Sequence, residues 1–328
     1  MFLNSFNHFR AIAIILIVAG HSYVEIPFNT VFNNFLQNLI TGGTTLFVFI
    51  SGFLFHHIFY KNFEYKNFIY KKFQNVYIPY FIMGLIPLFN IIHVDSISQF
   101  FKLHLTGGFF IAYWYIPFIL AFFLLSPLFV WFIKFNLKTQ IIITLIGITI
   151  SLFIHRPIDN LNVLHSVLYF SPVYLLGIIC SMNKQTIYTK LKGKELYLLL
   201  AVLVLAFIQS VYIGGGNYHK NLLIYKGIDL LFLQKIILSI FLMVYLHRFE
   251  NYKNKFIDLL AASSFAIFFI HPYFVTYFGM IRRYYDIHFT YPWLSYPFYL
   301  TLIVALSILV AVGIKKILGK NSRFITGY

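Results

Sequence analysis

The sequence predicts an all-α fold, a polytopic integral membrane helical bundle of about ten transmembrane helices with both termini in the cytoplasm (N-in/C-in). Two observations carry this prediction. Of the 328 residues, 60% are hydrophobic and only 10% are charged, whereas soluble domains average about 25% charged residues. The apolar residues also form long blocks, each near the roughly 20 residues that a helix needs to cross a bilayer. A membrane β-barrel would show period-two alternation instead, and the sequence has none.

Ten apolar runs between polar breaks are expected to form the membrane-crossing helices. They lie near residues 8–24, 40–58, 77–92, 111–133, 140–154, 162–181, 196–213, 229–246, 258–280 and 294–314. We expect the first run to be a retained span and not a signal peptide, because its n-region carries only Arg10 and no small-residue cleavage site follows it. There is no long linker and no appended soluble domain, so residues 1–328 are expected to form a single transmembrane domain.

The positive charges fall into two groups along the chain. Of the 25 Lys and Arg residues, 18 are expected on the same side of the membrane as the N-terminus. Six are expected on the opposite side, and Lys235 lies within the eighth span. Because Lys and Arg accumulate in short cytoplasmic loops, both termini are predicted to be cytoplasmic. The net charge of +16 is therefore attributed to insertion in a lipid bilayer and not to nucleic acid binding. The single cysteine, Cys180, excludes an intrachain disulfide and a multi-cysteine metal site, and no metal site is expected.

The first span carries ionisable residues at a defined spacing. In the stretch "FRAIAIILIVAGHSYVE", Arg10 precedes His21 by eleven residues, and Glu25 follows one turn later. At 100° per residue, eleven residues return to within about 20° of the same helix face, about 16 Å along the axis. Ionisable groups in an apolar span usually face an interior cavity and mark a functional path. The structural alternative is that Arg10 reaches the interface, His21 packs between helices and Glu25 lies in an outer loop.

Six segments, in order along the chain, resemble motifs of the bacterial acyltransferase family 3. They are "FRAIAIILIVAGHS" (9–22), "TLFVFISGFLF" (45–55), "YKKFQNVYIPYF" (70–81), "YWYIPFILAFFLLSPL" (113–128), "YFSPVYLLGIICS" (169–181) and "SSFAIFFIHPYF" (263–274). The first is similar to the family's Arg-x10-His helix and the last to its late His-Pro element. The "VYIPYFIMG" and His-Pro segments also resemble the polysaccharide intercellular adhesin modifiers within that family. The chain departs from the family at Gln74 and Asn75, where members often carry an arginine, and this weakens a basic clamp there.

The resemblance implies a multi-pass O-acyltransferase of the bacterial inner membrane. Such an enzyme would move an acyl group, expected to be acetyl, from cytoplasmic acyl-CoA to a hydroxyl of a cell-surface or exopolysaccharide glycan, or of a lipid-linked sugar. Acyl-CoA would be a co-substrate, and no bound cofactor is expected. Some members carry a further hydrolase-like domain, so here the membrane domain itself or separate polysaccharide-assembly proteins would complete the transfer.

Several candidate residues acquire chemical roles from this resemblance. His21 is the expected general base, because a neutral imidazole can remove a hydroxyl proton near pH 7. Glu25 would orient the imidazole, as the carboxylate does in a catalytic triad. Arg10 would bind the phosphates of CoA, since a guanidinium makes multidentate contacts with phosphate. Lys71 and Lys72 would add charge at the cytoplasmic entry, or alternatively only anchor the loop to the membrane.

Four further residues are candidates for the donor and acceptor sites. Ser51 would line the thioester channel, or together with Gly52 simply allow close helix packing. His271, which precedes a helix-kinking proline, would line the substrate cavity. Lys235 would bind a phosphate of the glycan or the donor, or find its partner on another helix. Trp114 is expected in an aromatic belt at the outer interface, and secondarily as a platform for sugar stacking.

Two other functions stay open at this point. The first is a transporter or flippase for a lipid-linked glycan, although such proteins are often built from repeats and no repeat is visible. The second is a non-catalytic subunit of a polysaccharide synthase, in which His21 would be replaceable. Turnover of acetyl-CoA by the purified protein would separate the three functions.

Overall fold

The computed structural model describes residues 3–23, 30–89, 91–158, 162–288 and 292–328. Across these residues the chain is almost entirely helical, with one isolated β-bridge between Arg156 and His219. The α-helices are α1 (Asn4–Ser22), α2 (Val31–Ile40), α3 (Gly43–Leu54), α4 (Tyr65–Lys72), α5 (Ile78–Leu85), α6 (Ile97–Thr106), α7 (Tyr115–Leu124), α8 (Ser126–Ile133), α9 (Leu137–Ile154), α10 (Val163–Met182), α11 (Lys184–Leu191), α12 (Glu195–Tyr212), α13 (Leu230–His247), α14 (Lys255–Tyr284), α15 (Pro292–Leu318) and α16 (Ser322–Thr326). The all-α prediction is confirmed.

The membrane-spanning character of the fold is also clear. Within the described residues, seven helical stretches are long and apolar enough to cross a membrane, or eight if the bent pair α7 and α8 is one span. These two helices meet at 56°, so the predicted span 111–133 is bent. The two remaining predicted spans fall on α1, whose first turns are polar, and on α5, which has only 8 residues. The polytopic architecture is therefore confirmed, and the count of ten stays a prediction.

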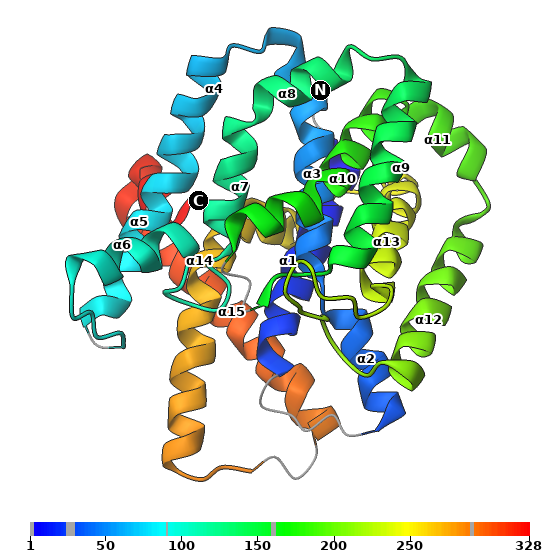
Figure 1. Cartoon of the computed structure of the whole chain (residues 1–328). Coiled ribbons are helices and arrows are strands. Elements are labelled where there is room, and N and C mark those ends of the chain that lie inside the picture. Colours follow the sequence, from blue (N-terminus) through cyan, green and yellow to red (C-terminus); the bar gives the residue numbers. More distant parts are fainter. Residues whose placement is uncertain (1–2, 24–29, 90, 159–161, 289–291) are drawn as a thin grey trace.

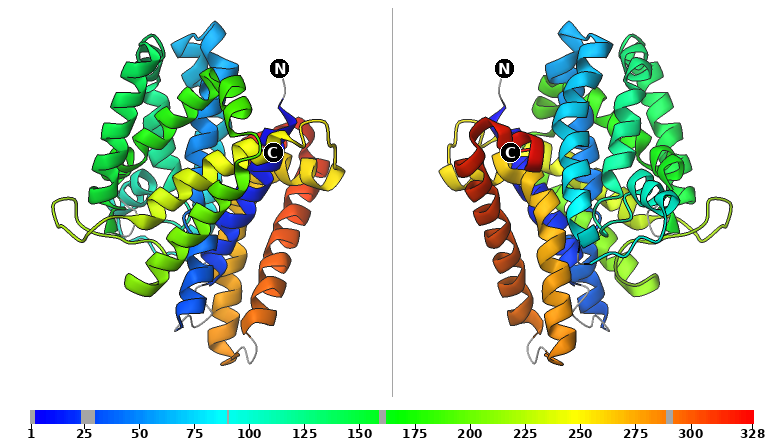
Figure 2. Two further views of the ribbon diagram at one scale, coloured as in Figure 1. Left: turned by 90° about the vertical axis from the view of Figure 1, so that its right-hand side faces the viewer. Right: turned by 90° about the vertical axis from the view of Figure 1, so that its left-hand side faces the viewer.

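Basic residues lie at both ends of the bundle. Figure 1 shows α4, α8 and α11 at the end where the N-terminus lies, and α2 with the far ends of α14 and α15 at the opposite end. Lys71, Lys72 and Lys190 lie on α4 and α11, whereas Arg282 and Arg283 lie in the last turn of α14. Figure 2 shows α14 and α15 side by side along one edge of the bundle. Which end faces the cytoplasm stays a prediction from the charge count.

Helices α2 and α3 belong to one apolar run, Val31–Asn62, which is interrupted at Gly42. This glycine has a φ of 76°, a left-handed conformation that glycine adopts without steric cost. Helix α2 begins where the Thr30 hydroxyl accepts a hydrogen bond from the amide of Asn33 at 3.2 Å. The sequence did not predict α2, because asparagines break its apolar pattern. One of them, Asn38, is buried and donates to the carbonyl oxygens of Ala206 in α12 and of Gly214 just after it.

Helix α1 lies at the centre of the bundle, where it packs against α3, α13, α14 and α15. Its apolar side chains are enclosed, and Ile14 and Val18 have no exposed surface. Its polar first turn is also buried, because the Glu250 carboxylate accepts hydrogen bonds from the backbone amides of Asn4 at 2.6 Å and Ser5 at 3.2 Å. Amides in the first helical turn have no intrahelical acceptor. The bundle therefore holds α1, with its ionisable residues, in the protein interior.

Candidate active site

One face of α1 opens onto two cavities. The larger, called the Arg10 cavity below, has a volume of about 300 Å³. The smaller, called the His21 cavity, has a volume of about 140 Å³. Ile17 lines both cavities. Because Ile17 lies seven residues after Arg10 and four before His21, the three side chains share one face of α1. The geometry that the eleven-residue spacing predicts is confirmed.

His21 forms a pair with a second histidine, from α14. Its Nδ1 lies 3.0 Å from Nε2 of His271, and the two rings are nearly parallel, with an interplanar angle of 12° and centroids 5.2 Å apart. Nδ1 of His271 lies 2.9 Å from the carbonyl oxygen of Ile267. His271 is completely buried, and these contacts fix its ring. The two histidines are 250 residues apart in the chain, and the sequence had not linked them.

The order of these contacts fixes the proton positions on the two neutral rings. A carbonyl oxygen can only accept, so His271 donates from Nδ1 and carries its lone pair on Nε2. That lone pair accepts the proton of His21 Nδ1. The remaining nitrogen of His21, Nε2, then carries a lone pair, and it forms no hydrogen bond with a described residue. A ring held in this tautomer can accept a proton from a hydroxyl group in the His21 cavity.

The Arg10 cavity collects cations from three separate elements. Arg10 of α1 donates to the Ser264 hydroxyl at 3.0 Å, Lys72 ends α4, and Arg323 comes from α16. In the described part of the chain, none of the three cations forms an ion pair. Asn75 lies in the same wall. Members of the family often carry an arginine near the position of Asn75, and this chain does not. In the structure, Arg323 near the C-terminus lines this cavity instead.

The two neighbouring lysines of α4 occupy different environments. Lys72 is half-buried, with Nζ 4.7 Å from the ring centroid of Phe59 and 4.5 Å from that of Phe123. Lys71 is exposed and lines a separate small pocket beside Glu64. The structure therefore brings Lys72 to Arg10 and leaves Lys71 outside the Arg10 cavity.

Ser51 and Gly52 have separate positions as well. Ser51 lines the Arg10 cavity. Gly52 faces α10, where a Cβ atom would overlap the carbonyl oxygen of Tyr174. Gly177 of α10 faces α3 in the same way, against the carbonyl oxygen of Phe49. The expected close helix packing at Gly52 is confirmed, and Ser51 beside it faces the cavity.

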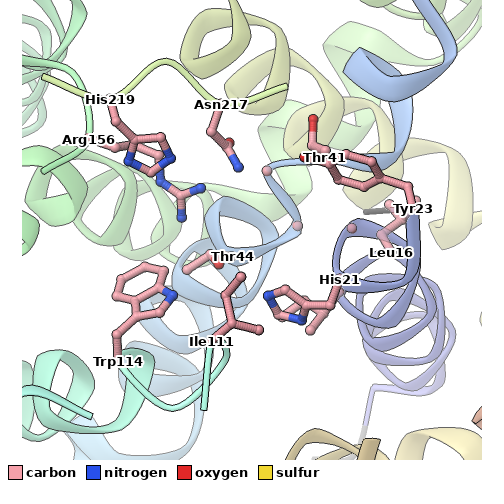
Figure 3. A pocket seen from close by; sticks show the side chains of 14 residues that line it. Leu16, His21, Tyr23, Thr41, Thr44, Ile111, Trp114, Arg156, Asn217 and His219 are labelled. Carbon is pink, nitrogen blue, oxygen red and sulfur yellow. The ribbon is translucent and has the colours of Figure 1, made fainter. Parts of the chain in front are cut away.

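Trp114 lies inside the protein. It is 5% exposed and lines the His21 cavity (Figure 3). The neighbouring Tyr113 and Tyr115 are also buried. The aromatic-belt interpretation is therefore wrong for Trp114. The physical reason is that the segment before α7 folds into the bundle, so its rings pack against protein and not against the lipid headgroups.

Lys235 and Glu25 complete the residues predicted from the sequence. Lys235 is 1% exposed, and its ammonium donates to the carbonyl oxygens of Asn38 and Leu39, each at 2.9 Å. It thus binds the carbonyl end of α2, where a cation is favoured, and it lines neither the Arg10 cavity nor the His21 cavity. Glu25 falls outside the described residues, and the partner that orients His21 in the structure is His271.

Arg156 and Arg323 are cavity residues that sequence reasoning missed. Arg156 lines the His21 cavity, although its sequence position indicated only a loop charge. It reaches the cavity because the loop after α9 folds inward and bridges to His219. Arg323 reaches the Arg10 cavity because α16 folds back against α5. No local pattern marks either residue, since both positions depend on tertiary contacts.

A family model described as an acyltransferase domain matches residues 3–312. No curated protein and no solved structure matches the chain. The matched region runs from the start of α1 into α15 and includes Arg10, Ile17 and His21, which line the two cavities. The chain therefore belongs to acyltransferase family 3 and is a multi-pass membrane acyltransferase.

Proposed function

We propose that the chain transfers an acyl group, expected to be acetyl, from cytoplasmic acyl-CoA to a hydroxyl of a cell-surface or lipid-linked glycan. The observation that carries this proposal is the position of Ile17. This one side chain borders both the cation-rich Arg10 cavity and the His21 cavity. From Ile17 to His21 the helix rises only about 6 Å. A donor bound at Arg10 would therefore have its thioester close to the base.

The Arg10 cavity has the chemistry that CoA requires. CoA carries a pyrophosphate and a 3′-phosphate, and guanidinium groups bind phosphate oxygens in a rigid, multidentate geometry. Arg10, Lys72 and Arg323 line the cavity, and none of its described lining residues is acidic. Apolar side chains such as Phe265 and Phe268 line other parts of the wall and would pack against the apolar portion of the donor.

The His21 cavity supplies the base for the transfer. His21 Nε2 takes the proton from the acceptor hydroxyl as the oxygen attacks the thioester carbon. The new C–O ester bond forms, the C–S bond breaks, and the CoA thiolate leaves with the proton that His21 received. His271 accepts a hydrogen bond from His21 throughout and so stabilises the imidazolium that forms transiently. The imidazole is neutral again at the end of the cycle.

Release of free CoA from acetyl-CoA by the purified chain tests this function. Addition of a glycan should start the release of thiol, measured with a colorimetric thiol reagent. A glycan flippase would move its substrate without consuming acetyl-CoA, and a non-catalytic synthase subunit would release no thiol. Absence of glycan-dependent thiol release from a folded chain that binds acetyl-CoA would contradict the proposal.

The donor site should respond to pH through Lys72. Burial, and to a lesser extent the nearby Arg323, lowers the pKa of Lys72 to about 8. The ammonium form attracts phosphate and the amine form does not, so acetyl-CoA affinity should fall as the pH rises through this value. The fall should approach about tenfold per pH unit above the pKa, if binding takes up one proton. Calorimetric titration between about pH 7 and pH 9 measures it.

The adjacent lysines provide a matched pair of variants for this measurement. Lys72→Arg keeps its charge over the whole range and should bind acetyl-CoA with little pH dependence. Lys71→Arg alters an exposed residue outside the cavity and should keep the dependence of the unmodified chain. A pH dependence that survives in Lys72→Arg and disappears in Lys71→Arg would exclude Lys72 from the donor site.

A further inference from the structure

A buried arginine lies in the His21 cavity, on the loop between α9 and α10. Arg156 is 5% exposed and lines the cavity together with Thr44 and Asn217. Its backbone carbonyl accepts a hydrogen bond from the amide of Lys220 at 3.0 Å, which fixes the loop against the segment between α12 and α13. Arg156 is therefore part of the cavity wall and not a solvated loop charge.

Two aromatic rings hold the guanidinium group of Arg156 in place. Its central carbon lies 5.1 Å from the ring centroid of Trp114 and 5.4 Å from that of Phe170. These two rings are themselves stacked, with an interplanar angle of 24°. Aromatic contacts use the flat face of a guanidinium and leave its N–H edge available for hydrogen bonds.

The guanidinium of Arg156 forms no hydrogen bond or ion pair within the described part of the chain, and its Nε is buried without a partner. Asp229 interacts with it only through space. The Asp229 carboxylate instead accepts hydrogen bonds from the Tyr169 hydroxyl at 2.8 Å and from the amide of Phe232 at 2.9 Å. A buried donor without an acceptor costs free energy, and the cost is larger for a charged group. The guanidinium in this cavity therefore lacks a hydrogen-bond acceptor, which an anionic ligand would supply.

Arg156 and His21 lie on different sides of the cavity. Figure 3 shows Arg156 and Asn217 grouped together, His21 on the other side, and Thr44 between them. A guanidinium edge binds a carboxylate or a phosphate through two parallel hydrogen bonds. A ligand in this cavity can thus hold an anionic group at Arg156 while it presents a hydroxyl to Nε2 of His21.

We infer that the acceptor is an anionic glycan unit, whose carboxylate or phosphate group binds Arg156 while its reacting hydroxyl faces His21. This inference rests on the proposed function and adds to it the charge class of the acceptor. An uncharged sugar would leave the buried guanidinium without a charged hydrogen-bond acceptor in the complex. The proton transfer and the bond changes at the thioester are the same for either class of acceptor.

Equilibrium binding of three small probes to the purified chain tests the inference. Methyl glucuronide carries a carboxylate, glucose 1-phosphate carries a phosphate, and methyl glucoside is the neutral reference. By calorimetry, at least one of the two acids should bind the unmodified chain about tenfold or more tightly than methyl glucoside, as expected for a charged hydrogen bond. The acid that binds more tightly identifies the source of the anionic group.

Variants at Arg156 connect this preference to the cavity. Arg156→Gln should abolish the preference for acids, and Arg156→Lys, which keeps the charge without the fork, should retain part of it. Lys226→Gln is the matched control, because Lys226 is an exposed cation in a loop of the same region. It should keep the full preference. Thermal unfolding midpoints show whether each variant is folded.

The outcomes separate this inference from the proposed function. Equal affinity of the unmodified chain for all three probes would overturn the inference, even if Arg156→Gln failed to fold. An unchanged acid preference in folded Arg156→Gln would also overturn it. A loss of turnover in Arg156→Gln with undiminished acid binding would also contradict it, because Arg156 would then stabilise the transition state and not bind the anionic group. Glycan acylation without a preference for acids would contradict the inference and leave the proposed function intact. Acid binding through Arg156 without any acyl transfer would contradict the proposed function and leave the Arg156 anion site intact.

Discussion

Replacement of His21 by alanine should reduce the rate of glycan acylation by about 10²–10⁴-fold, the usual contribution of a general base. The expectation follows from the hydrogen-bond chain Ile267–His271–His21, which leaves Nε2 of His21 as the free proton acceptor. Acetyl-CoA binding should stay near normal, because the donor is proposed to bind in the Arg10 cavity. Transfer rates with labelled acetyl-CoA, measured beside calorimetric binding of the donor, test both statements.

Companion variants separate the base from its positioning residue. His21→Gln should lose as much activity as His21→Ala, since an amide is not a proton acceptor near neutral pH. His271→Gln should lose less, because its amide oxygen can still accept from His21 Nδ1, but its pH–rate profile should shift. In the unmodified chain the rate should fall on acidification, because a protonated His21 has no lone pair. Near-normal glycan acylation by His21→Ala, in a strain lacking other acyltransferases, would return His21 to a packing role.

The largest expected effect on stability is at the contact between α3 and α10. A Cβ atom at Gly52 would overlap the carbonyl oxygen of Tyr174, and one at Gly177 would overlap that of Phe49. Backbone atoms cannot move aside as a flexible side chain does, so the two helices would have to separate. Gly52→Ala should therefore destabilise the chain by about 3 kcal/mol or more, at or above the upper end for overpacking. Thermal unfolding in detergent measures the effect.

Gly313 offers a matched control for this stability prediction. It also lies within a helix, α15, but nothing lies within 4 Å of the position that its Cβ would take. Gly313→Ala should be neutral or stabilising by up to about 1 kcal/mol, the intrinsic helix preference of alanine over glycine. If Gly52→Ala and Gly313→Ala have the same unfolding midpoint, the close packing of α3 and α10 is not critical for stability.

Sequence reasoning captured those features of the site that depend on a single helix. The eleven-residue spacing of Arg10 and His21 places both on one face because α-helical periodicity is fixed. Composition and apolar run length predicted the membrane bundle for a similar reason, since the bilayer sets helix length. The expectation of a small residue for close packing at Gly52 also needed only local information.

The features that the sequence could not supply depend on contacts between distant segments. His21 meets His271 across 250 residues, and Arg156 enters the His21 cavity only because its loop folds inward. Trp114 is buried by the same kind of folding, although its aromatic neighbours are typical of a membrane interface. The separation of Lys71 from Lys72 depends on which side of α4 faces the bundle.

The most direct test of the central claim is acyl transfer across a membrane by the purified chain in proteoliposomes. Labelled acetyl-CoA is placed on the side of the N-terminus and the glycan acceptor on the opposite side. We expect the label to appear on the glycan. It should be lost with His21→Ala and with Ile17→Trp, which places a bulky ring at the one α1 position that lines both cavities. Transfer that requires donor and acceptor on the same side, or that persists in His21→Ala, would contradict the account.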